Sequence, residues 1–233
     1  AMAGQIDGTV TGPISKEAIH GAGYHYAGHT EIYGSLTDTV DYAMMLVDNG
    51  FRVVHVSTHV SLREACDRVK KDRITTVINL THSAVRQMGV SSPSIAVAGL
   101  NPHCGEGGMF GDEEMREILP AVREANARGL TVEGPIPADT VFVKMRGGMF
   151  DAVVVMYHDQ GHIPAKLVGF QYNDRTKSWD SMSGVNVTLG LPIIRTSVDH
   201  GTAFDKAGDN CANPQSMVEA IKLAAVLAAA GVS

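Results

Sequence analysis

Short apolar runs along the chain predict strands, and longer segments of mixed polarity between them predict helices. Residues 52–56, 94–98 and 151–156 are apolar almost throughout. Runs of this length are typical of parallel strands that are covered on both faces. Two further strands are predicted at residues 7–11 and 193–196.

Helices are predicted in most of the intervening segments. They are expected at residues 15–19, 39–47, 112–128 and 214–230, with two more between 61 and 88 that divide near Asp72. Ser61 and Glu64 have the spacing of a capping box at a helix start, and Gly129 suits a helix end. This alternation predicts an α/β fold with a mostly parallel or mixed sheet. The polar residues 171–183 predict an exposed loop or hairpin.

Composition excludes several classes of protein. The 233 residues carry a formal net charge of −6, which gives no general attraction to nucleic acid or to an anionic membrane. No apolar stretch has the length of a membrane span, and the N-terminus lacks a signal-peptide pattern. The three cysteines are widely spaced and odd in number, so a disulfide framework or a thiolate zinc site is not expected. A reducing cytoplasm fits this pattern best.

Three histidines follow predicted strands in segments that contain glycine or proline. They are His59, His103 and His158. Ligands collect beyond the carboxyl ends of strands in open α/β sheets, and imidazole is a common metal ligand, so these residues predict a divalent metal site. The alternative is three unrelated polar loop residues. His55 lies within a strand and is expected to be a core histidine, whereas the histidines expected on surfaces or helices are His20, His25 and His82.

Other polar residues predict an anion site. His29 and Thr30 follow Gly28, which suits anion capture by backbone N–H groups and side-chain donors, although Thr30 as a helix N-cap explains the pattern equally well. Arg195 ends an apolar run, where a cation needs an anionic partner. Lys166 lies downstream of His158, in the passage from the loop to the following helix, and Asn186 lies in the segment 184–188. A structural salt bridge is the alternative for each of these residues.

The segment from Asp199 to Gly208, with Ala212-Asn213-Pro214 after it, resembles the part of isocitrate and isopropylmalate dehydrogenases that surrounds the adenosine of NAD. The alternative is a glycine-rich turn before a helix. The residues that would contact the cofactor are His200, Gly201, Thr202, Ala203, Asp205 and Asn213.

Longer stretches resemble the 4-hydroxythreonine-4-phosphate dehydrogenase family, known as PdxA. They are TGPISKEAI, GHTE, HVSTHVSLRE, GLNPHCGEGG, GPIPADTVF, MYHDQGHIPAKL and GVNVTLGLPIIRTSVDHGTA. The segments HVSTH and YHDQGHIP are similar to those of a sister group, whose members oxidise 4-phospho-D-threonate or 4-phospho-D-erythronate.

The resemblance implies a fold, a reaction and a site. The fold would be a mixed-sheet, three-layer architecture like that of isocitrate and isopropylmalate dehydrogenases. The activity would be oxidation, with decarboxylation, of a 4-phosphorylated 3-hydroxy acid with NAD or NADP. His59, His103 and His158 would bind Zn, Mg, Mn or Co between the two subunits of a homodimer. The substrate would contact His29, Thr30, Lys166, Asn186 and Arg195, and Lys166 or Asp139 would act in catalysis.

Two departures from the family pattern affect these expectations. A segment that family members carry before Thr9 is absent, so we expect an N-terminally truncated fold. Residues 1–21 and 182–233 would then be the remnant of a cofactor-binding domain, and 22–181 the metal, substrate and dimerisation domain. Residues 171–183 are an insertion that could alter substrate choice. The alternative functions are a fragment that binds metal and phosphorylated ligand without turnover, and a metal-dependent hydrolase or lyase.

Overall fold

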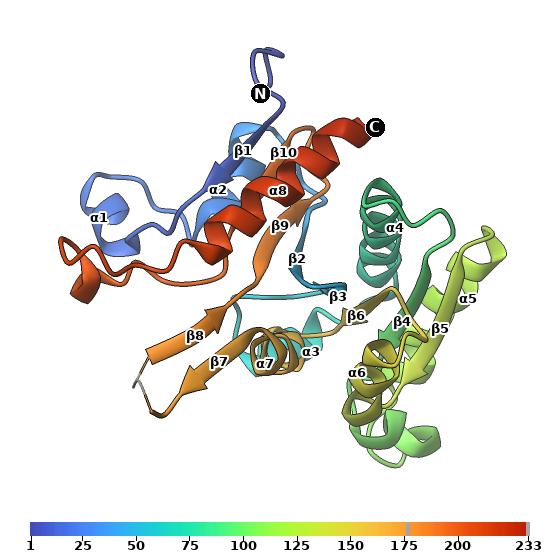
Figure 1. The fold of residues 1–233 in the computed structure, drawn as a ribbon. Coiled ribbons are helices and arrows are strands. Elements are labelled where there is room, and N and C mark those ends of the chain that lie inside the picture. The colour runs from blue at the N-terminus through green and yellow to red at the C-terminus, as the bar shows by residue number, and fades with distance from the viewer. Residues whose placement is uncertain (176–177, 232–233) are drawn as a thin grey trace.

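An eight-stranded mixed sheet crosses the molecule in the computed structural model, which describes residues 1–175 and 178–231 (Figure 1). The strand order is β1-β10-β9-β2-β3-β6-β4-β5. The bounds are β1 Gly8–Thr11, β2 Ala43–Asp48, β3 Phe51–His55, β4 Ser94–Ala98, β5 Thr131–Ile136, β6 Ala152–Val155, β9 Val185–Leu189 and β10 Ile194–Val198. Strands β3, β6, β4 and β5 are mutually parallel, whereas β2 and β9 pair antiparallel with their neighbours.

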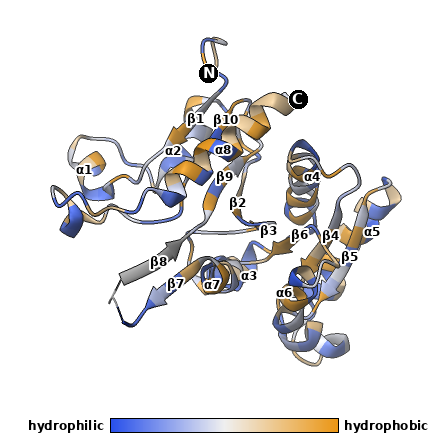
Figure 2. Ribbon diagram, in the orientation of Figure 1, coloured by the Kyte–Doolittle hydropathy of each residue, from blue (hydrophilic) through white to orange (hydrophobic). Residues whose placement is uncertain are grey.

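Helices cover both faces of this sheet and make three layers. Apolar side chains of α4, α5 and α8 pack in one core with one face, and those of α6 and α7 pack in a second core on the opposite face. The helix bounds are α1 Lys16–Gly21, α2 His29–Leu36, α3 Leu62–Asp67, α4 Lys71–Gln87, α5 Leu119–Ala127, α6 Ala138–Arg146, α7 His158–Gly169 and α8 Gln215–Ala230. Shorter helical turns are η1 Pro102–Gly108, η2 Glu114–Ile118 and η3 Phe204–Lys206. Figure 2 shows hydrophobic residues along the central strands and on parts of α4 and α8.

The predicted strands are confirmed, with shifts of one or two residues at most ends. The helix predicted at 15–19 is confirmed as α1, and the two predicted between residues 61 and 88 are confirmed as α3 and α4. The Ser61 side chain accepts a hydrogen bond from the backbone N–H of Glu64 at 3.2 Å. The helix predicted at 112–128 is confirmed as η2 followed by α5, and the closing helix as α8.

The helix predicted at residues 39–47 is wrong, because this segment forms strand β2. Asn49 and Gly50 join β2 to β3 in a two-residue hairpin, with φ of 44° and 88°. Left-handed backbone at both positions is the geometry that an Asn-Gly hairpin turn requires. Residues 43–46 are apolar because they are buried at the centre of the sheet. Their apolar character does not reflect one face of a helix.

The polar insertion forms a two-stranded hairpin from β7 Phe170–Asn173 and β8 Ser178–Met182, as predicted, although residues 176–177 lie outside the described residues. Helices α2 and α6 were not predicted. No helix in the described ranges is long and apolar enough to cross a membrane.

The first and last parts of the chain lie together at one end of the sheet. β1 pairs in parallel with β10, and α8 packs against both strands (Figure 1). The domain division at residues 21 and 182 stays a prediction, as does the specific likeness to isocitrate and isopropylmalate dehydrogenases.

Candidate functional site

Four histidines gather at the carboxyl ends of β3 and β6. The ring centroids of His59 and His158 are 5.7 Å apart. His158 stacks on His162, with centroids 3.6 Å apart and an interplanar angle of 9°. His55, at the end of β3, lies 4.7 Å from the His162 ring. Because β3 and β6 are parallel neighbours, the segments that follow them meet at the same edge, as the sequence predicts.

The start of α7 determines which nitrogen of His158 is available. Helix α7 begins at His158 itself, directly after β6 and Tyr157. The Nδ1–H of His158 donates to the Asp159 carboxylate at 2.6 Å, so Nε2 is the ring nitrogen that remains available to other partners. A carboxylate behind an imidazole in this way is the common arrangement for a metal-binding histidine. Asp159 therefore fixes the orientation of the His158 ring.

The two histidines behind His158 are neutral. Burial, followed by the nearby His162, lowers the pKa of His55 to about 3. Burial, followed by His158, lowers the pKa of His162 to about 4. Nδ1–H of His162 donates to the His158 carbonyl at 3.0 Å, and Nδ1–H of His55 donates to the Met44 carbonyl at 3.2 Å. The Nε2 atom of His55 is buried without a hydrogen-bond partner among the described residues. His55 is a core histidine, as expected, but half of its ring is unsatisfied.

His103 does not join this group within one copy of the chain. The described residues contain no set of three histidine, cysteine or acidic side chains that could hold a metal ion. His103 lies in η1, after β4, and its side chain is exposed. Each of the three histidines follows a predicted strand, and these strands, β3, β6 and β4, are parallel neighbours in the sheet. A metal site shared by all three rings stays a prediction.

The backbone that carries His103 is a left-handed turn. Residues 103–107 all have positive φ, including 52° at His103, 56° at Cys104 and 43° at Glu106. Each non-glycine residue in this region costs about 1–2 kcal/mol, so the turn persists only where other contacts hold it. Burial raises the pKa of the Cys104 thiol to about 11, and Glu114 and Asp139 add to this effect.

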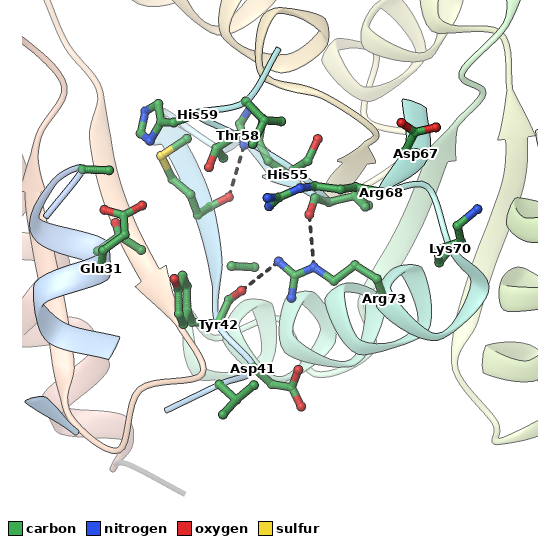
Figure 3. A pocket seen from close by; sticks show the side chains of 18 residues that line it. Glu31, Asp41, Tyr42, His55, Thr58, His59, Asp67, Arg68, Lys70 and Arg73 are labelled. Atoms are coloured by element: carbon green, nitrogen blue, oxygen red, sulfur yellow. Dashed lines mark hydrogen bonds between the residues drawn. The ribbon is translucent and has the colours of Figure 1, made fainter. Parts of the chain in front are cut away.

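Helix α2 brings a second group of polar residues to a cavity beside His59. The cavity has a volume of about 700 Å³, and Thr30 is one of its lining residues. Glu31 and His59 lie on one side of it and Arg68 and Arg73 on the other (Figure 3). The His59 side chain, as hydrogen-bond partner, is the main cause that lowers the pKa of Glu31. Arg73 donates to the backbone carbonyls of Val56 and Tyr42, so its guanidinium has a structural role.

Arg195 is buried, and none of its hydrogen-bond partners in the described part of the chain is an anion. It is 3% exposed, and its guanidinium donates to the hydroxyls of Thr188 at 3.2 Å and Thr11 at 2.8 Å. Its Nε atom has no partner among those residues. The ring of Tyr33 lies 5.8 Å from the guanidinium carbon. Burial lowers the Arg195 pKa to about 10, so the side chain remains a cation at neutral pH.

His29 and Asn186 lie around this cation. Burial lowers the pKa of His29, and the charge of Arg195 lowers it further. Asn186 lies on β9 two residues before Thr188, on the same face of the sheet, and its Oδ1 atom is buried without a partner in residues 1–175 and 178–231. An unsatisfied buried donor on a buried cation is a feature of a site that binds an anion, and an unsatisfied acceptor beside it suits a hydroxyl of the same ligand.

The predicted catalytic residues lie on different helices. Lys166 is on α7, eight residues after His158, and its Nζ is 5.6 Å from the centre of the Phe170 ring. Asp139 is exposed in the first turn of α6. Lys16, in the first turn of α1, contributes to the lowered pKa of Glu31.

The segment predicted to bind NAD connects β10 to α8 and is mostly exposed. Nδ1–H of His200 donates to the Gly201 carbonyl at 2.9 Å, and Ala203 has φ of 47°. The Asn213 side chain accepts from the N–H of Gln215 at the start of α8. Contact of Gly201, Thr202 and Asp205 with the cofactor stays a prediction.

Sequence reasoning missed several residues of the site. His162 is one of them, although it lies four residues after His158 and on the same stripe of α7. The four-residue spacing of His158 and His162 predicts neighbouring side chains only if residues 158–169 form a helix. Glu31 stands next to Thr30 and had no role assigned to it. Thr11 and Thr188 are ordinary strand residues, and nothing in their spacing points to Arg195.

Comparison with protein families gives a match that covers nearly the whole chain. Residues 1–224 match the family described as pyridoxal phosphate biosynthetic protein PdxA. A protein of Pectobacterium atrosepticum named D-threonate 4-phosphate dehydrogenase is 49% identical over 98% of this chain and 67% of its own length.

Solved structures agree with this match. A 4-hydroxythreonine-4-phosphate dehydrogenase from Klebsiella pneumoniae is 49% identical, with a TM-score of 0.82 over 97% of this chain and 66% of that one. A terephthalate 1,2-cis-dihydrodiol dehydrogenase from Burkholderia xenovorans is 31% identical, with a TM-score of 0.72 over 97% and 68% of the two chains. The chain spans about two thirds of the length of these relatives.

Proposed function

The chain belongs to the PdxA family, and on this premise we propose that it is an NAD-dependent, metal-dependent dehydrogenase of a 4-phosphorylated 3-hydroxy acid. The substrate would be 4-phospho-D-threonate or 4-hydroxy-L-threonine phosphate, which differ at C2 in a hydroxyl or an amino group. Oxidation at C3 gives a β-keto acid, which loses carbon dioxide.

The unsatisfied cation at Arg195 is the observation that carries the proposal. A buried guanidinium whose protein partners are hydroxyls calls for an anion, and a substrate phosphate supplies oxygen acceptors in the geometry of the guanidinium. His29, Thr30 and Asn186 would complete the polar contacts of the substrate. Lys166 would add a second positive charge from α7.

His59 and His158 fit a divalent metal by their donor atoms and spacing. Both present imidazole nitrogens at the same edge of the sheet, and Asp159 fixes the tautomer of His158. Imidazole ligands favour a borderline ion such as zinc over magnesium. A bound divalent ion there would polarise the substrate oxygen at C3 and stabilise the negative charge that develops during decarboxylation.

A third ligand would come from a second copy of the chain. His103 is exposed on a turn that does not reach His59 and His158 within one copy. A homodimer in which His103 of one protomer completes the site of its partner accounts for both observations. The metal site would then lie between subunits.

Other residues of the chain would bind the substrate or transfer the proton of its C3 hydroxyl. Arg195 and His29 hold the phosphate end of the substrate, which fixes C3 near the histidine cluster. Lys166 or Asp139 would move the proton released by the C3 hydroxyl. NAD supplies the hydride acceptor, and His200 to Asn213 would contact its adenosine.

The test is NADH formation followed by absorbance with each phosphorylated substrate and a divalent metal. We expect turnover that Arg195→Ala reduces at least about 100-fold, mainly through weaker substrate binding, since a hydrogen-bonded charge partner is worth several kcal/mol. If the unchanged protein turns over the substrate and Arg195→Ala binds that substrate with the same affinity, Arg195 does not bind its phosphate. Metal and phosphate binding without NAD binding would instead favour the non-catalytic alternative.

A metal-dependent hydrolase or lyase would use the same histidines and anion site. The relatives named above are all dehydrogenases, including one whose substrate name contains no phosphate. This favours redox chemistry as the property that these relatives share. The anion site would be the part that differs between relatives with different substrates. Release of inorganic phosphate without NADH formation would favour the hydrolase.

A further inference from the structure

Glu114 is a buried acidic residue that the proposed function does not use. Its side chain is 2% exposed and lies at the start of η2. Oε1 accepts hydrogen bonds from the backbone N–H groups of Leu100 at 2.7 Å and Asn101 at 2.6 Å. Oε2 accepts from Nδ2 of Asn101 at 2.9 Å. All three donors belong to the two residues that lead from β4 into the His103 turn.

The turn is also fitted closely around this carboxylate. A Cβ atom at Gly105 would lie 3.0 Å from Oε2 of Glu114 and 2.6 Å from the Gly111 carbonyl. A Cβ atom at Gly99 would lie 3.2 Å from Oε1 of Glu114 and 2.8 Å from the Cys104 sulfur. Glycine on both sides therefore lets the left-handed turn wrap around Glu114.

We propose that Glu114 is the positioning residue for His103: its buried carboxylate fixes Leu100 and Asn101 and so holds the left-handed turn that presents the exposed imidazole. This inference rests on the proposed function, which makes His103 a metal ligand. The hydrogen bonds of Glu114 go to the turn and not to a proposed ligand of the metal or substrate. Its effect on metal binding would pass through the turn that carries His103.

The experiment compares Glu114→Gln with Glu117→Gln in the full chain, with Co²⁺ as the metal probe. In Glu114→Gln an NH2 group replaces one carboxylate oxygen. With the remaining oxygen on the N–H groups of Leu100 and Asn101, this NH2 faces the Nδ2 donor of Asn101. Glu117, on the same helical turn, accepts from the Lys71 N–H at 2.8 Å, away from the His103 segment. We expect Co²⁺ affinity to fall about 10–100-fold in Glu114→Gln, as for other residues that orient a ligand, and to stay within about twofold in Glu117→Gln.

A double variant separates positioning from general destabilisation. In a His103→Ala background, Glu114→Gln should cause no further loss of Co²⁺ affinity, although the losses of thermal stability should add. A further loss by the same factor, or wild-type affinity in Glu114→Gln alone, would overturn the proposal. If Glu114→Gln does not fold, Asn101→Ala removes the Oε2 contact, together with the hydrogen bond from Asn101 to Glu113, and keeps both contacts of Oε1. It should show a smaller loss with the same dependence on His103.

Failure of the proposed function has a different result. Unchanged Co²⁺ affinity in His103→Ala would remove His103 from the ligand set. Hydrogen exchange of residues 99–111 would then decide the role of Glu114: faster exchange in Glu114→Gln than in Glu117→Gln supports its hold on the turn, and equal exchange in the two variants overturns it.

Discussion

Gln160 joins the two segments that carry His103 and His158. It is 7% exposed in the first turn of α7, and its Oε1 accepts from the N–H of Met156 at 2.7 Å. Its Nε2 donates to the carbonyl of Gly99 at 2.7 Å. One amide therefore satisfies a donor after β6 and an acceptor after β4, which fixes the spacing of the two loops.

Gln160→Ala should lower the free energy of unfolding by about 2 kcal/mol, because it leaves a buried N–H and a buried carbonyl unpaired. Urea denaturation measures this change. Gln171→Ala is the control, since Gln171 is exposed and its loss should cost less than about 0.5 kcal/mol. Equal effects of the two substitutions would contradict the bridging role.

Asp48 makes stability depend on pH. Its buried carboxylate accepts from the hydroxyl of Ser183 at 3.0 Å, at the base of the β7–β8 hairpin. Burial raises the pKa of Asp48 above its ordinary value. The folded state then binds a proton more tightly than the unfolded state, so this contribution to stability is present below the unfolded pKa and is lost as pH rises through the folded pKa.

Asp48→Asn removes this titration while keeping an oxygen acceptor for Ser183. We expect the stability of the variant relative to the unchanged protein to increase as pH rises from about 4 towards 7. Denaturation at a series of pH values measures the difference. A difference that stays constant over this range would show that Asp48 does not titrate as its burial implies.

The sequence can predict a residue's role where that role depends on its neighbours along the chain. His59 and His158 follow apolar strands, and their rings do lie together. Glu114 and Gln160 could not be assigned in this way, because their partners are far along the chain and are set by strand order. The same is true of Arg195, whose contacts with Thr11 and Thr188 depend on which strands pair.

At the scale of elements, the hairpin of β2 and β3 shows what a local signal can decide. Asn49-Gly50 between two apolar runs is a strong hairpin signal, yet we expected a helix before it. The four apolar residues 43–46 fit either a buried strand or a helix face, and only the turn distinguishes them. Helix α7 is the opposite case, since its glycine and proline residues suggested a loop.

Gly50→Ala should lower stability by about 1–2 kcal/mol, because alanine is strained at φ of 88°. No atom of the described residues lies within 4 Å of the added Cβ, so the cost comes from the backbone alone. Gly21→Ala is the matched control, since that site is also open but lies in α1 without positive φ, and alanine there should be neutral or stabilising. Thermal unfolding compares the two variants, and equal shifts in Tm would refute the turn assignment.

At the scale of the whole molecule, the sheet brings two predicted ligands together and leaves the third exposed. The sequence predicts three histidines after three strands, and the order β3-β6-β4 agrees. The sequence cannot predict which histidine rings lie together. Their positions depend on the left-handed turn at His103 and on where a second copy of the chain binds.

Mixing His103→Ala and His158→Ala variants tests the shared site. Each variant alone lacks one ligand in every site, whereas a mixed dimer has one site with all three histidines. With random exchange of equal amounts, about a quarter of the wild-type Co²⁺ sites should return, as measured by the cobalt absorption band. No recovery after demonstrated subunit exchange would mean that the three histidines do not meet across a dimer.

The amide bridge at Gln160 has a consequence for such a dimer. The loop that serves the site of the partner is tied through Gly99 to the helix start that serves the protomer's own site. Ordering of one centre would then favour ordering of the other, which is positive cooperativity between metal sites. A Hill coefficient above about 1 for Co²⁺, reduced to about 1 by Gln160→Ala, would be its signature.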